Sequence, residues 1–291
     1  MRPPILSIED LSPICDISSD HQFVILKNYF DGGNQPDSKQ YDVLSLASVS
    51  GTISQWRAFE DDWKPVLKKH GAPWLHTTDA VSLKNDPFTA ANGWNKTKRD
   101  AFLSDCVTVV EKHLLQPMQI KPPGKHGLMP HVVTVVLRDF IRARDNNPEV
   151  PKDVTELCVT QSVAQAMERG RASFGAHFFH LIFDQKEPFK KHVVQRQENR
   201  KARKHLAEIV NRLTSITEAD MRNVPALQMA DLFAWSYSHK LQTPHHSWQK
   251  RLLQHRKWID DWYDYDILVQ IRPGVSDLVN SWKLPASRPT R

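Results

Sequence analysis

The chain has 291 residues, a formal net charge of +6, 40% hydrophobic residues and 25% charged residues. This composition is ordinary for a globular protein, and the mild basic excess is compatible with a polyanionic partner without requiring one. No apolar run reaches the roughly 18 residues that a membrane-spanning helix needs, and residues 1–20 lack the apolar core of a signal peptide. The three cysteines are widely spaced without a CxxC pair, which favours neither a disulfide framework nor a zinc ribbon. We therefore expect a cytoplasmic protein that does not span a membrane.

The first segments of the chain predict a loose leader, a pair of strands and a helix. Residues 1–20 are polar and contain prolines, which indicates the leader. Two apolar runs within residues 22–51 predict antiparallel strands. In "TISQWRAFEDDWKPVLKKHG" the aromatic and aliphatic residues recur at helical spacing, and Gly71 is a natural helix stop. Pro65 within this run predicts a kink or an early end of the helix.

The middle of the chain alternates between helical and strand-like patterns. The segment "APWLHTTD" is expected to be extended, and residues 80–94 are expected to form a loop. Helical spacing returns over residues 95–115, whereas the β-branched run at residues 131–140 predicts a strand. Residues 146–153 resemble a linker, and a helix capped near Asp153 is expected to follow.

The last part of the chain predicts one more strand and two helices. The apolar run "HFFHLIFD" predicts a strand that ends at Asp184. A long charged helix is expected at about residues 187–213, and another helix near Pro225, because proline suits a first helical turn. Together these patterns predict an α/β domain over residues 21–242, with helices packed on a mixed sheet. Residues 243–291 are expected to form a C-terminal extension.

Three aspartates stand where carboxylates are unexpected. The apolar stretch in "FVILKNYFDGGNQ" ends on Asp31, a second apolar run ends on Asp184, and Asp231 lies inside "VPALQMADLFAW". For Asp31 the simpler interpretation is a hairpin turn, since Asp-Gly is a strong turn signal. For Asp231 the simpler interpretation is a side chain that points to solvent or caps a turn. If the two strands are neighbours in one sheet, the three carboxylates can instead converge.

Convergent carboxylates would suit a hard divalent cation. Mg²⁺ takes carboxylate oxygens and keeps waters for substrate phosphates. Two such ions can stabilise both the attacking and the leaving oxygen when a phosphodiester is hydrolysed. The chain has no HExxH, GxSxG or Walker motif, which disfavours a zinc hydrolase, a serine hydrolase and a nucleotide-cradling loop. The aspartates therefore suggest a metal-dependent nuclease.

Five segments also carry a resemblance to a known family. They are "YFDGG", "WRAFEDDWKPVL", "WLHTTD", "LIFDQKE" and "VPALQMADLFAW", of which the last is the most specific. Across about residues 25–240 the chain resembles the large prokaryotic family known as domain of unknown function 3800. That family is grouped with ribonuclease H-like folds, whose metal ligands lie on the first strand, a middle strand and a late helix. The resemblance implies a ribonuclease H-like mixed sheet flanked by helices, with Mg²⁺ or Mn²⁺ bound by the catalytic residues Asp31, Asp184 and Asp231.

One position departs from the family pattern. Relatives often have glutamate after the first aspartate, where this chain has Gly32, so one possible ligand is missing. His76 and Asp79 are candidates to take its place. The alternative is that "HTTD" caps the next helix, through Thr78 or Asp79. Gln228 shares a helical face with the third aspartate and is expected either to orient a ligand or to hydrogen-bond to backbone.

A basic run, "FKKHVVQRQENRKARKH", follows Asp184 closely. The simpler interpretation is a solvated face of a helix. The alternative is a surface that contacts nucleic-acid phosphates beside the metal site. The residues expected to make these contacts are Lys190, Lys191, Arg200 and Lys201.

These observations favour a Mg²⁺- or Mn²⁺-dependent hydrolase that cleaves the phosphodiester bonds of DNA or RNA. The alternative is a non-catalytic module on the same fold that binds nucleic acid or protein through basic and aromatic surfaces. The glycine at position 32 favours that alternative. A glycosidase with a pair of carboxylates is a third interpretation, but no sugar-stacking pattern supports it.

Overall fold

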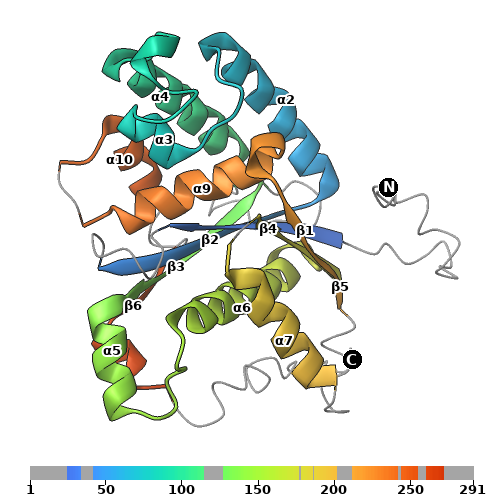
Figure 1. Cartoon of the computed structure of the whole chain (residues 1–291). Helices are drawn as coiled ribbons and strands as arrows, with labels where there is room; N and C mark the ends of the chain where they lie inside the picture. The colour runs from blue at the N-terminus through green and yellow to red at the C-terminus, as the bar shows by residue number, and fades with distance from the viewer. Residues whose placement is uncertain are drawn as a thin grey trace, which may run out of the picture.

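The computed structural model describes residues 25–33, 42–114, 127–176, 178–185, 187–201, 212–241, 244–254 and 260–271. These residues form one mixed β-sheet with helices packed on both faces (Figure 1). The predicted α/β architecture, a mixed sheet flanked by helices, is therefore confirmed. The predicted leader at residues 1–20 lies outside the described residues.

The sheet has six strands in the order β5-β4-β1-β2-β3-β6. Their bounds are β1 Ile25–Gly33, β2 Val43–Gly51, β3 Met129–Val136, β4 Phe178–Asp184, β5 Leu213–Ala219 and β6 Asp260–Tyr263. β2 is antiparallel to both of its neighbours, which confirms the antiparallel pair predicted within residues 22–51. The pairs β1–β4, β4–β5 and β3–β6 are parallel. The carboxyl ends of β1 and β4 therefore lie next to each other although they are far apart in the sequence.

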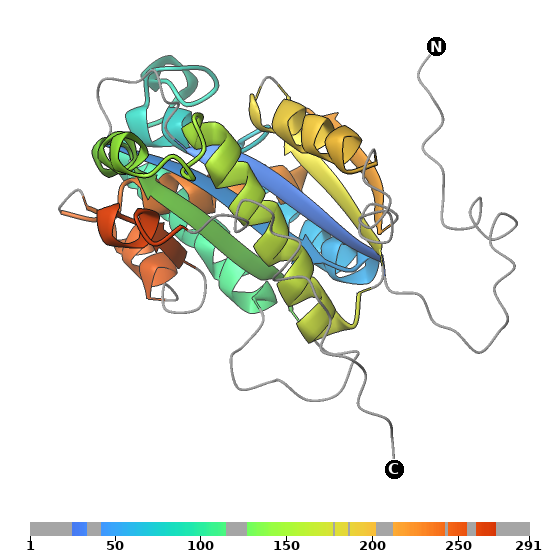
Figure 2. The same ribbon diagram turned by 90° about the horizontal axis from the view of Figure 1, so that it is seen from below.

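Each face of the sheet carries its own layer of helices (Figures 1 and 2). On one face lie α2 Ile53–His70, α3 Thr77–Ser82, α4 Lys96–His113, α9 Pro225–Ser238 and α10 Ser247–Leu253. On the other face lie α5 Leu137–Asn146, α6 Val154–Phe174, α7 Phe189–Lys201 and α12 Tyr265–Leu268. The short 3-10 helices are η1 Ala90–Asn92 and η3 Met221–Asn223. None of the helices in the described ranges is both long and apolar enough to cross a membrane.

Side chains alternate between the two faces along each strand. Tyr29 and Ile182 belong to the apolar core beneath α9, whereas Phe30 and Phe183 belong to the core beneath α6. The rings of Phe30 and Phe183 stack with centroids 4.6 Å apart, which joins β1 to β4 on the α6 side. The next residue along each of these strands must therefore point to the α9 side.

The ends of α2 follow the signals in its sequence. Thr52 and Gln55 form a capping box at the start, and Gly71 ends the helix in the left-handed region with φ of 65°. The predicted stop at Gly71 is thus confirmed. The helix continues past Pro65 to His70, so the predicted early end is wrong.

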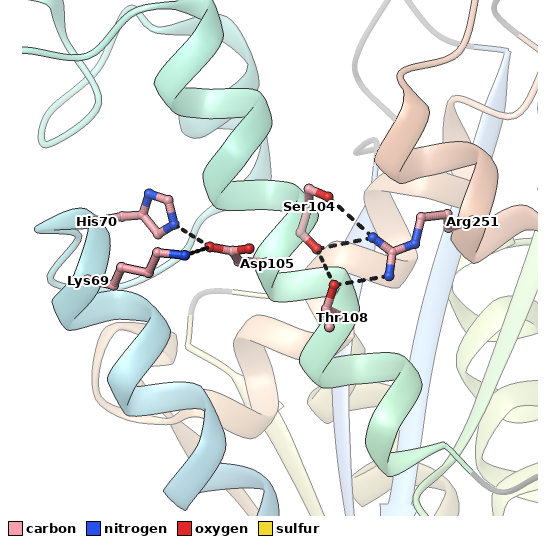
Figure 3. A network of polar contacts seen from close by, with 6 residues as sticks. All are labelled: Lys69, His70, Ser104, Asp105, Thr108 and Arg251. Carbon is pink, nitrogen blue, oxygen red and sulfur yellow. Dashed lines mark hydrogen bonds and ion pairs between the residues drawn. The ribbon is translucent and has the colours of Figure 1, made fainter.

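Polar side chains join α4 to the helices on either side of it (Figure 3). Asp105 of α4 lies 2.7 Å from Nζ of Lys69 and 2.7 Å from Nε2 of His70, both in α2. Arg251 of α10 donates to Oγ of Ser104 at 3.2 Å and to Oγ1 of Thr108 at 3.0 Å. These contacts hold α2, α4 and α10 in one layer.

The β-branched run predicted as a strand at residues 131–140 divides into two elements. The strand ends at Val136, and α5 begins at the next residue, so the predicted strand is too long. Phe140 and Ala143 have helical spacing and are both buried, and this packing outweighs the β propensity of the preceding run. The predicted cap of the following helix is confirmed, because the Asp153 side chain accepts a hydrogen bond from the backbone of Thr155.

Two strands lie where the sequence predicts none. Leu213 already belongs to β5, so the prediction of a charged helix that reaches residue 213 is wrong. The described part of that helix, α7, ends at Lys201. β6 lies within residues 243–291 and pairs with β3 as a sixth strand of the same sheet. Both strands form through contacts with residues far away in the chain.

Candidate metal centre

Asp31 and Asp184 lie side by side near the carboxyl ends of two neighbouring parallel strands. Phe30 of β1 pairs with Phe183 of β4, and the two aspartates are the next residues along the two strands. Neighbouring strands are about 4.8 Å apart, and alternation turns both aspartates toward the face covered by α9. The prediction that the strands ending on these aspartates are neighbours is confirmed.

The Asp-Gly-Gly sequence does not form a turn. Asp31, Gly32 and Gly33 remain in β1 and pair with residues 45–47 of β2, so the hairpin-turn interpretation is wrong. The second glycine permits a close approach instead. A Cβ atom on Gly33 would lie 2.8 Å from the carbonyl oxygen of Ala234, which leaves α9 no room for a side chain there.

The close approach of α9 brings the third aspartate to the same face. Every side chain of α9 is buried, which is typical of a helix enclosed on all sides. Asp231 precedes Ala234 by about one turn, and it is only 5% exposed. Its Oδ2 accepts a hydrogen bond of 2.5 Å from the backbone N–H of Thr77. The interpretation that Asp231 points to solvent is therefore wrong.

Asp31 is buried among other carboxylates. Its Oδ1 accepts a hydrogen bond of 2.8 Å from the N–H of Gly32, whereas its buried Oδ2 has no hydrogen-bond partner. Burial raises the pKa of Asp31 well above its usual value, and the charges of Asp231, Glu187 and Asp184 raise it further. An unpaired buried carboxylate oxygen is costly unless a cation or a proton neutralises it.

The other two aspartates are perturbed in the same direction. Burial raises the pKa of Asp184, with the charges of Asp231 and Asp220 acting in the same sense. The N–H of Met221, 2.9 Å from Oδ1 of Asp184, opposes this shift. Burial also raises the pKa of Asp231, which the charge of His76 partly opposes. In the part of the chain that the structure describes, no Lys or Arg side chain forms an ion pair with any of the three predicted ligands.

His76 faces this group of carboxylates and is held by Asp79. Its Nδ1 lies 2.6 Å from Oδ2 of Asp79, and Oδ1 of Asp79 accepts a 2.7 Å hydrogen bond from Asn85. Burial alone lowers the pKa of His76. The hydrogen bond to Asp79 and the charges of Asp231, Asp79 and Asp184 outweigh burial and raise this pKa to about 9. The imidazole is therefore positively charged at neutral pH and balances part of the negative charge.

The segment "HTTD" does not cap a helix in the way that its sequence suggests. α3 begins at Thr77 after an N-cap at His76, whose side chain makes no capping hydrogen bond. Thr78 and Asp79 lie inside the helix, so the capping interpretation is wrong for both. Both carboxylate oxygens of Asp79 are hydrogen-bonded, and a positively charged imidazole has no lone pair for a metal, so neither candidate replacement ligand is free to bind a cation as it stands.

Gln228 holds together the backbone around the site. Its Oε1 accepts hydrogen bonds from Nε1 of Trp63 at 2.9 Å and from the N–H of Leu75 at 3.0 Å. Its Nε2 donates to the carbonyl oxygen of Met221 at 2.9 Å. Leu75 precedes His76, and Met221 is the residue whose N–H binds the carboxylate at the end of β4. Gln228 is a positioning residue, and its bonds to backbone match one of the two expectations for it.

Glu187 is a further carboxylate near the three aspartates, and its charge raises the pKa of Asp31. It lies between β4 and α7, three residues after Asp184, and it is partly buried. Its Oε2 would be 3.3 Å from a Cβ atom placed on Gly32. In the segment "LIFDQKEP" this acidic residue follows the strand-end aspartate by three positions and directly precedes Pro188.

The predicted nucleic-acid contacts are spread along α7. Lys190 and Lys191 lie in its first turn, whereas Arg200 and Lys201 lie about 15 Å further along the helix axis. Nζ of Lys190 is 3.1 Å from Oε2 of Glu218 in β5, and Lys191 is exposed. The side chains of Arg200 and Lys201 lie outside the described residues. Of the four, only the first two lie close to the end of β4.

The donor types at this site fit a divalent cation. Carboxylate oxygens are the ligands that Mg²⁺ prefers, and one buried oxygen of Asp31 has no partner. The residues that would hold such an ion are Asp31, Asp184 and Asp231. Within the described ranges, no group of three or more His, Cys, Asp or Glu side chains is arranged to hold a metal ion as it stands. Carboxylates repel one another unless a cation lies between them.

Comparison of the chain with models of protein families found no match, and comparison with curated protein sequences found none.

Proposed function

We propose that this chain is a metal-dependent nuclease with a ribonuclease H-like fold, related to the family known as domain of unknown function 3800. Asp31, Asp184 and Asp231 bind Mg²⁺ or Mn²⁺, and the substrate is a phosphodiester of DNA or RNA. The observation that carries the proposal is that the buried Asp31 of β1, the partly buried Asp184 of β4 and the buried Asp231 of α9 lie near enough for their charges to act on one another. The resemblance implies ligands on a first strand, a middle strand and a late helix, and these three elements agree with that order.

The position of the site in the sheet supports a ligand-binding role. From β1 the chain adds β2 and β3 on one side, whereas β4 and β5 lie on the other side. In open α/β sheets, ligands bind outside the carboxyl ends of the strands, where the strand order reverses. Asp31 and Asp184 lie at that point of this sheet.

The residues around the site have separate roles in the proposed reaction. A bound Mg²⁺ or Mn²⁺ would act as a Lewis acid toward the phosphate oxygens of the substrate. The three aspartates bind it, and Asp79 holds the ring of His76 toward them. The positive charge of His76 attracts the phosphate group, and Lys191 at the start of α7 offers a further cation to the substrate backbone.

The test is cleavage of labelled DNA and RNA, each single- and double-stranded, with Mg²⁺ or Mn²⁺. Asp184→Asn should abolish cleavage and should retain or strengthen substrate binding, because it removes a negative charge beside a polyanion. Asp145→Asn, an identical change at an exposed position on α5, should leave cleavage unchanged.

If the protein binds nucleic acid without cleaving it, the chain is the non-catalytic binding module and not a nuclease. Lys190→Gln and Lys191→Gln together would then weaken binding and reduce its salt dependence by about one unit of slope per lost phosphate contact. A protein that neither binds nor cleaves any of the four substrates would contradict both functions.

A further inference from the structure

Trp74 is a large aromatic side chain that neither apolar core uses. Among the tryptophans in the described ranges, Trp74 and Trp262 stay partly exposed, and the others are buried. Trp74 lies between α2 and α3 and belongs to neither of the two clusters of core residues. A single exposed apolar side chain is ordinary on a protein surface, so the neighbours of Trp74 decide what its ring can do.

An arginine from a distant part of the chain lies over the ring of Trp74. The guanidinium carbon of Arg222 in η3 is 6.0 Å from the ring centre, within the range of a cation–π interaction. Asp220 fixes this guanidinium, because Nε and Nη2 of Arg222 lie 3.0 Å and 2.7 Å from Oδ2 of Asp220. The carboxylate also balances the charge of Arg222. The pair therefore offers flat surfaces to a ligand rather than a free cation.

The segment that carries Trp74 leads directly into the proposed metal site. Three residues after Trp74, the backbone N–H of Thr77 donates to Oδ2 of Asp231. Three residues of chain span at most about 11 Å, so the backbone of Trp74 lies at the edge of the site.

The segment that carries Arg222 leads into the same site from the sheet. Met221 precedes Arg222, and its N–H donates to Oδ1 of Asp184 at 2.9 Å. Gln228 joins the two segments, since its Oε1 accepts from the N–H of Leu75 and its Nε2 donates to the carbonyl oxygen of Met221. The indole ring and the guanidinium are thus held beside two different ligands of the proposed cation.

This pair of flat groups suits a nucleobase. Aromatic rings and guanidinium planes bind bases by stacking. Inside a duplex each base is covered on both faces by its neighbours, so an indole beside the site can stack only on an unpaired base. We infer that Trp74, backed by Arg222, is a stacking platform for an unpaired base next to the scissile phosphodiester, and that the substrate is single-stranded DNA or RNA. This inference rests on the proposed nuclease function and adds the strand state of its substrate.

The experiment measures binding by fluorescence anisotropy, with labelled DNA and RNA oligonucleotides of one sequence, each single-stranded and as a duplex. The protein is the full chain with Asp184→Asn, which leaves the substrate uncut. Adding Trp74→Leu keeps an apolar side chain but removes the ring, and it should raise the Kd for the single strand about 5- to 150-fold. The Kd for the duplex should not change. Trp74→Phe keeps a ring and should stay within about threefold of the Kd with Trp74.

The matched control is Trp262→Leu, in β6 at one edge of the sheet. Trp262 is also a partly exposed tryptophan with a cation over its ring, because Nζ of Lys240 lies 3.7 Å from the ring centre. It is separated from β1 by β2 and β3. This substitution should leave the Kd for every oligonucleotide unchanged.

Salt dependence gives a second readout that separates stacking from charge. Trp74→Leu removes no phosphate contact, so the slope of log Kd against log salt concentration should stay the same for the single strand. A changed slope would show that Trp74 acts on phosphate contacts and would overturn the stacking role.

The outcomes separate this inference from the proposed function. Equal losses of single-strand and duplex binding in Trp74→Leu would overturn the platform, and so would equal losses in Trp74→Leu and Trp74→Phe or in Trp74→Leu and Trp262→Leu. If the protein with Asp184 intact cleaves nucleic acid with Mg²⁺ or Mn²⁺ and Trp74→Leu leaves single-strand binding unchanged, the nuclease stands and the platform is wrong. A protein that binds none of the oligonucleotides would overturn both.

Discussion

Asp62 and Asp105, which join α2 to α4, can be compared with the aspartates at the ends of β1 and β4. Asp62 lies 2.7 Å from Nζ of Lys112 and 2.6 Å from Nε2 of His113. Asp105 makes the same pair of contacts with a lysine and a histidine of α2 (Figure 3). Hydrogen bonds from these lysines and histidines lower the pKa of both carboxyl groups. Each of these two carboxylates thus has a lysine and a histidine beside it.

The aspartates at the end of the sheet have the opposite surroundings. Burial and neighbouring carboxylates raise the pKa of Asp31, and burial also raises the pKa values of Asp184 and Asp231. In the described residues a lysine and a histidine lie beside each of the partly exposed Asp62 and Asp105, whereas no Lys or Arg forms an ion pair with any of the three aspartates at the sheet end. Carboxylates that repel one another without a cation lower the free energy of unfolding, and residues that serve a function commonly lower it in this way. This difference is the reason that we propose a cation from outside the chain at the end of the sheet.

Addition of a divalent cation should give the largest effect. At about 100 times its dissociation constant, Mn²⁺ should stabilise the fold by about 2.7 kcal/mol. For a domain of this size that corresponds to a rise in melting temperature of roughly 5–10 °C, measurable by differential scanning calorimetry. Asp31→Asn should lose this rise, and Asp105→Asn should keep it. If the melting temperature of the wild-type protein does not rise at millimolar Mn²⁺, the aspartates at the sheet end do not bind a cation, and the proposed difference between them and Asp62 and Asp105 is wrong.

Substitution of Gly33 should test whether the close approach of α9 creates the site. In Gly33→Ala the new Cβ atom would collide with the backbone of Ala234, which should lower the free energy of unfolding by about 1–3 kcal/mol. The shift of α9 should also move Asp231 and weaken the response to Mn²⁺.

Gly170→Ala is the control for this substitution, with urea denaturation as the measurement. There the new Cβ atom meets only side-chain atoms of Leu26 and Phe179, and alanine is the better helix former by about 1 kcal/mol. Its loss of stability should therefore be smaller. Equal losses in the two variants would show that the approach of α9 to β1 is not specially tight.

Removal of one charge from each region should change stability in opposite directions. Without metal, Asp31→Asn should raise the free energy of unfolding by about 1 kcal/mol, because it relieves repulsion among buried carboxylates. Asp105→Asn should lower it by about 0.5 kcal/mol, a small value because the Asp105 side chain is 34% exposed and its ion pairs are screened by solvent. The same sign for both variants in urea denaturation would contradict the comparison.

The smallest effect concerns pH. The pKa of Asp105 is lower in the folded than in the unfolded state, so its ion pairs stabilise the fold above the unfolded pKa of about 3.9. This contribution is lost as the pH falls through the folded pKa. The pKa of Asp31 is raised on folding, so its charge destabilises the fold above that raised pKa and has no effect below about pH 3.9. The differences of both variants from wild type, measured in urea at pH 7 and at about pH 3, should therefore shrink at the acidic pH.

Local patterns in the sequence were sufficient to predict the main helices and the strands that carry the aspartates. Helical spacing and a glycine stop predicted α2, and a cap at Asp153 predicted the start of α6. Both signals act within a few residues along the chain, which is why they can be read without a fold. Local signals of this kind did not predict β5 and β6, because an edge strand forms through pairing with a strand that lies elsewhere in the sequence. The local sequence "LTSITEA" contains no information about the strand with which it pairs.

The sequence by itself determined which residues are anomalous: an aspartate at the end of each of two apolar runs and one inside an apolar helix. Only the tertiary structure decided what surrounds them. The pairing of Phe30 with Phe183 sets the two strand-end aspartates side by side, and the fit of α9 against Gly33 adds the third. These contacts join segments separated by more than a hundred residues, and van der Waals contact and charge act through space, so no local pattern along the chain records them.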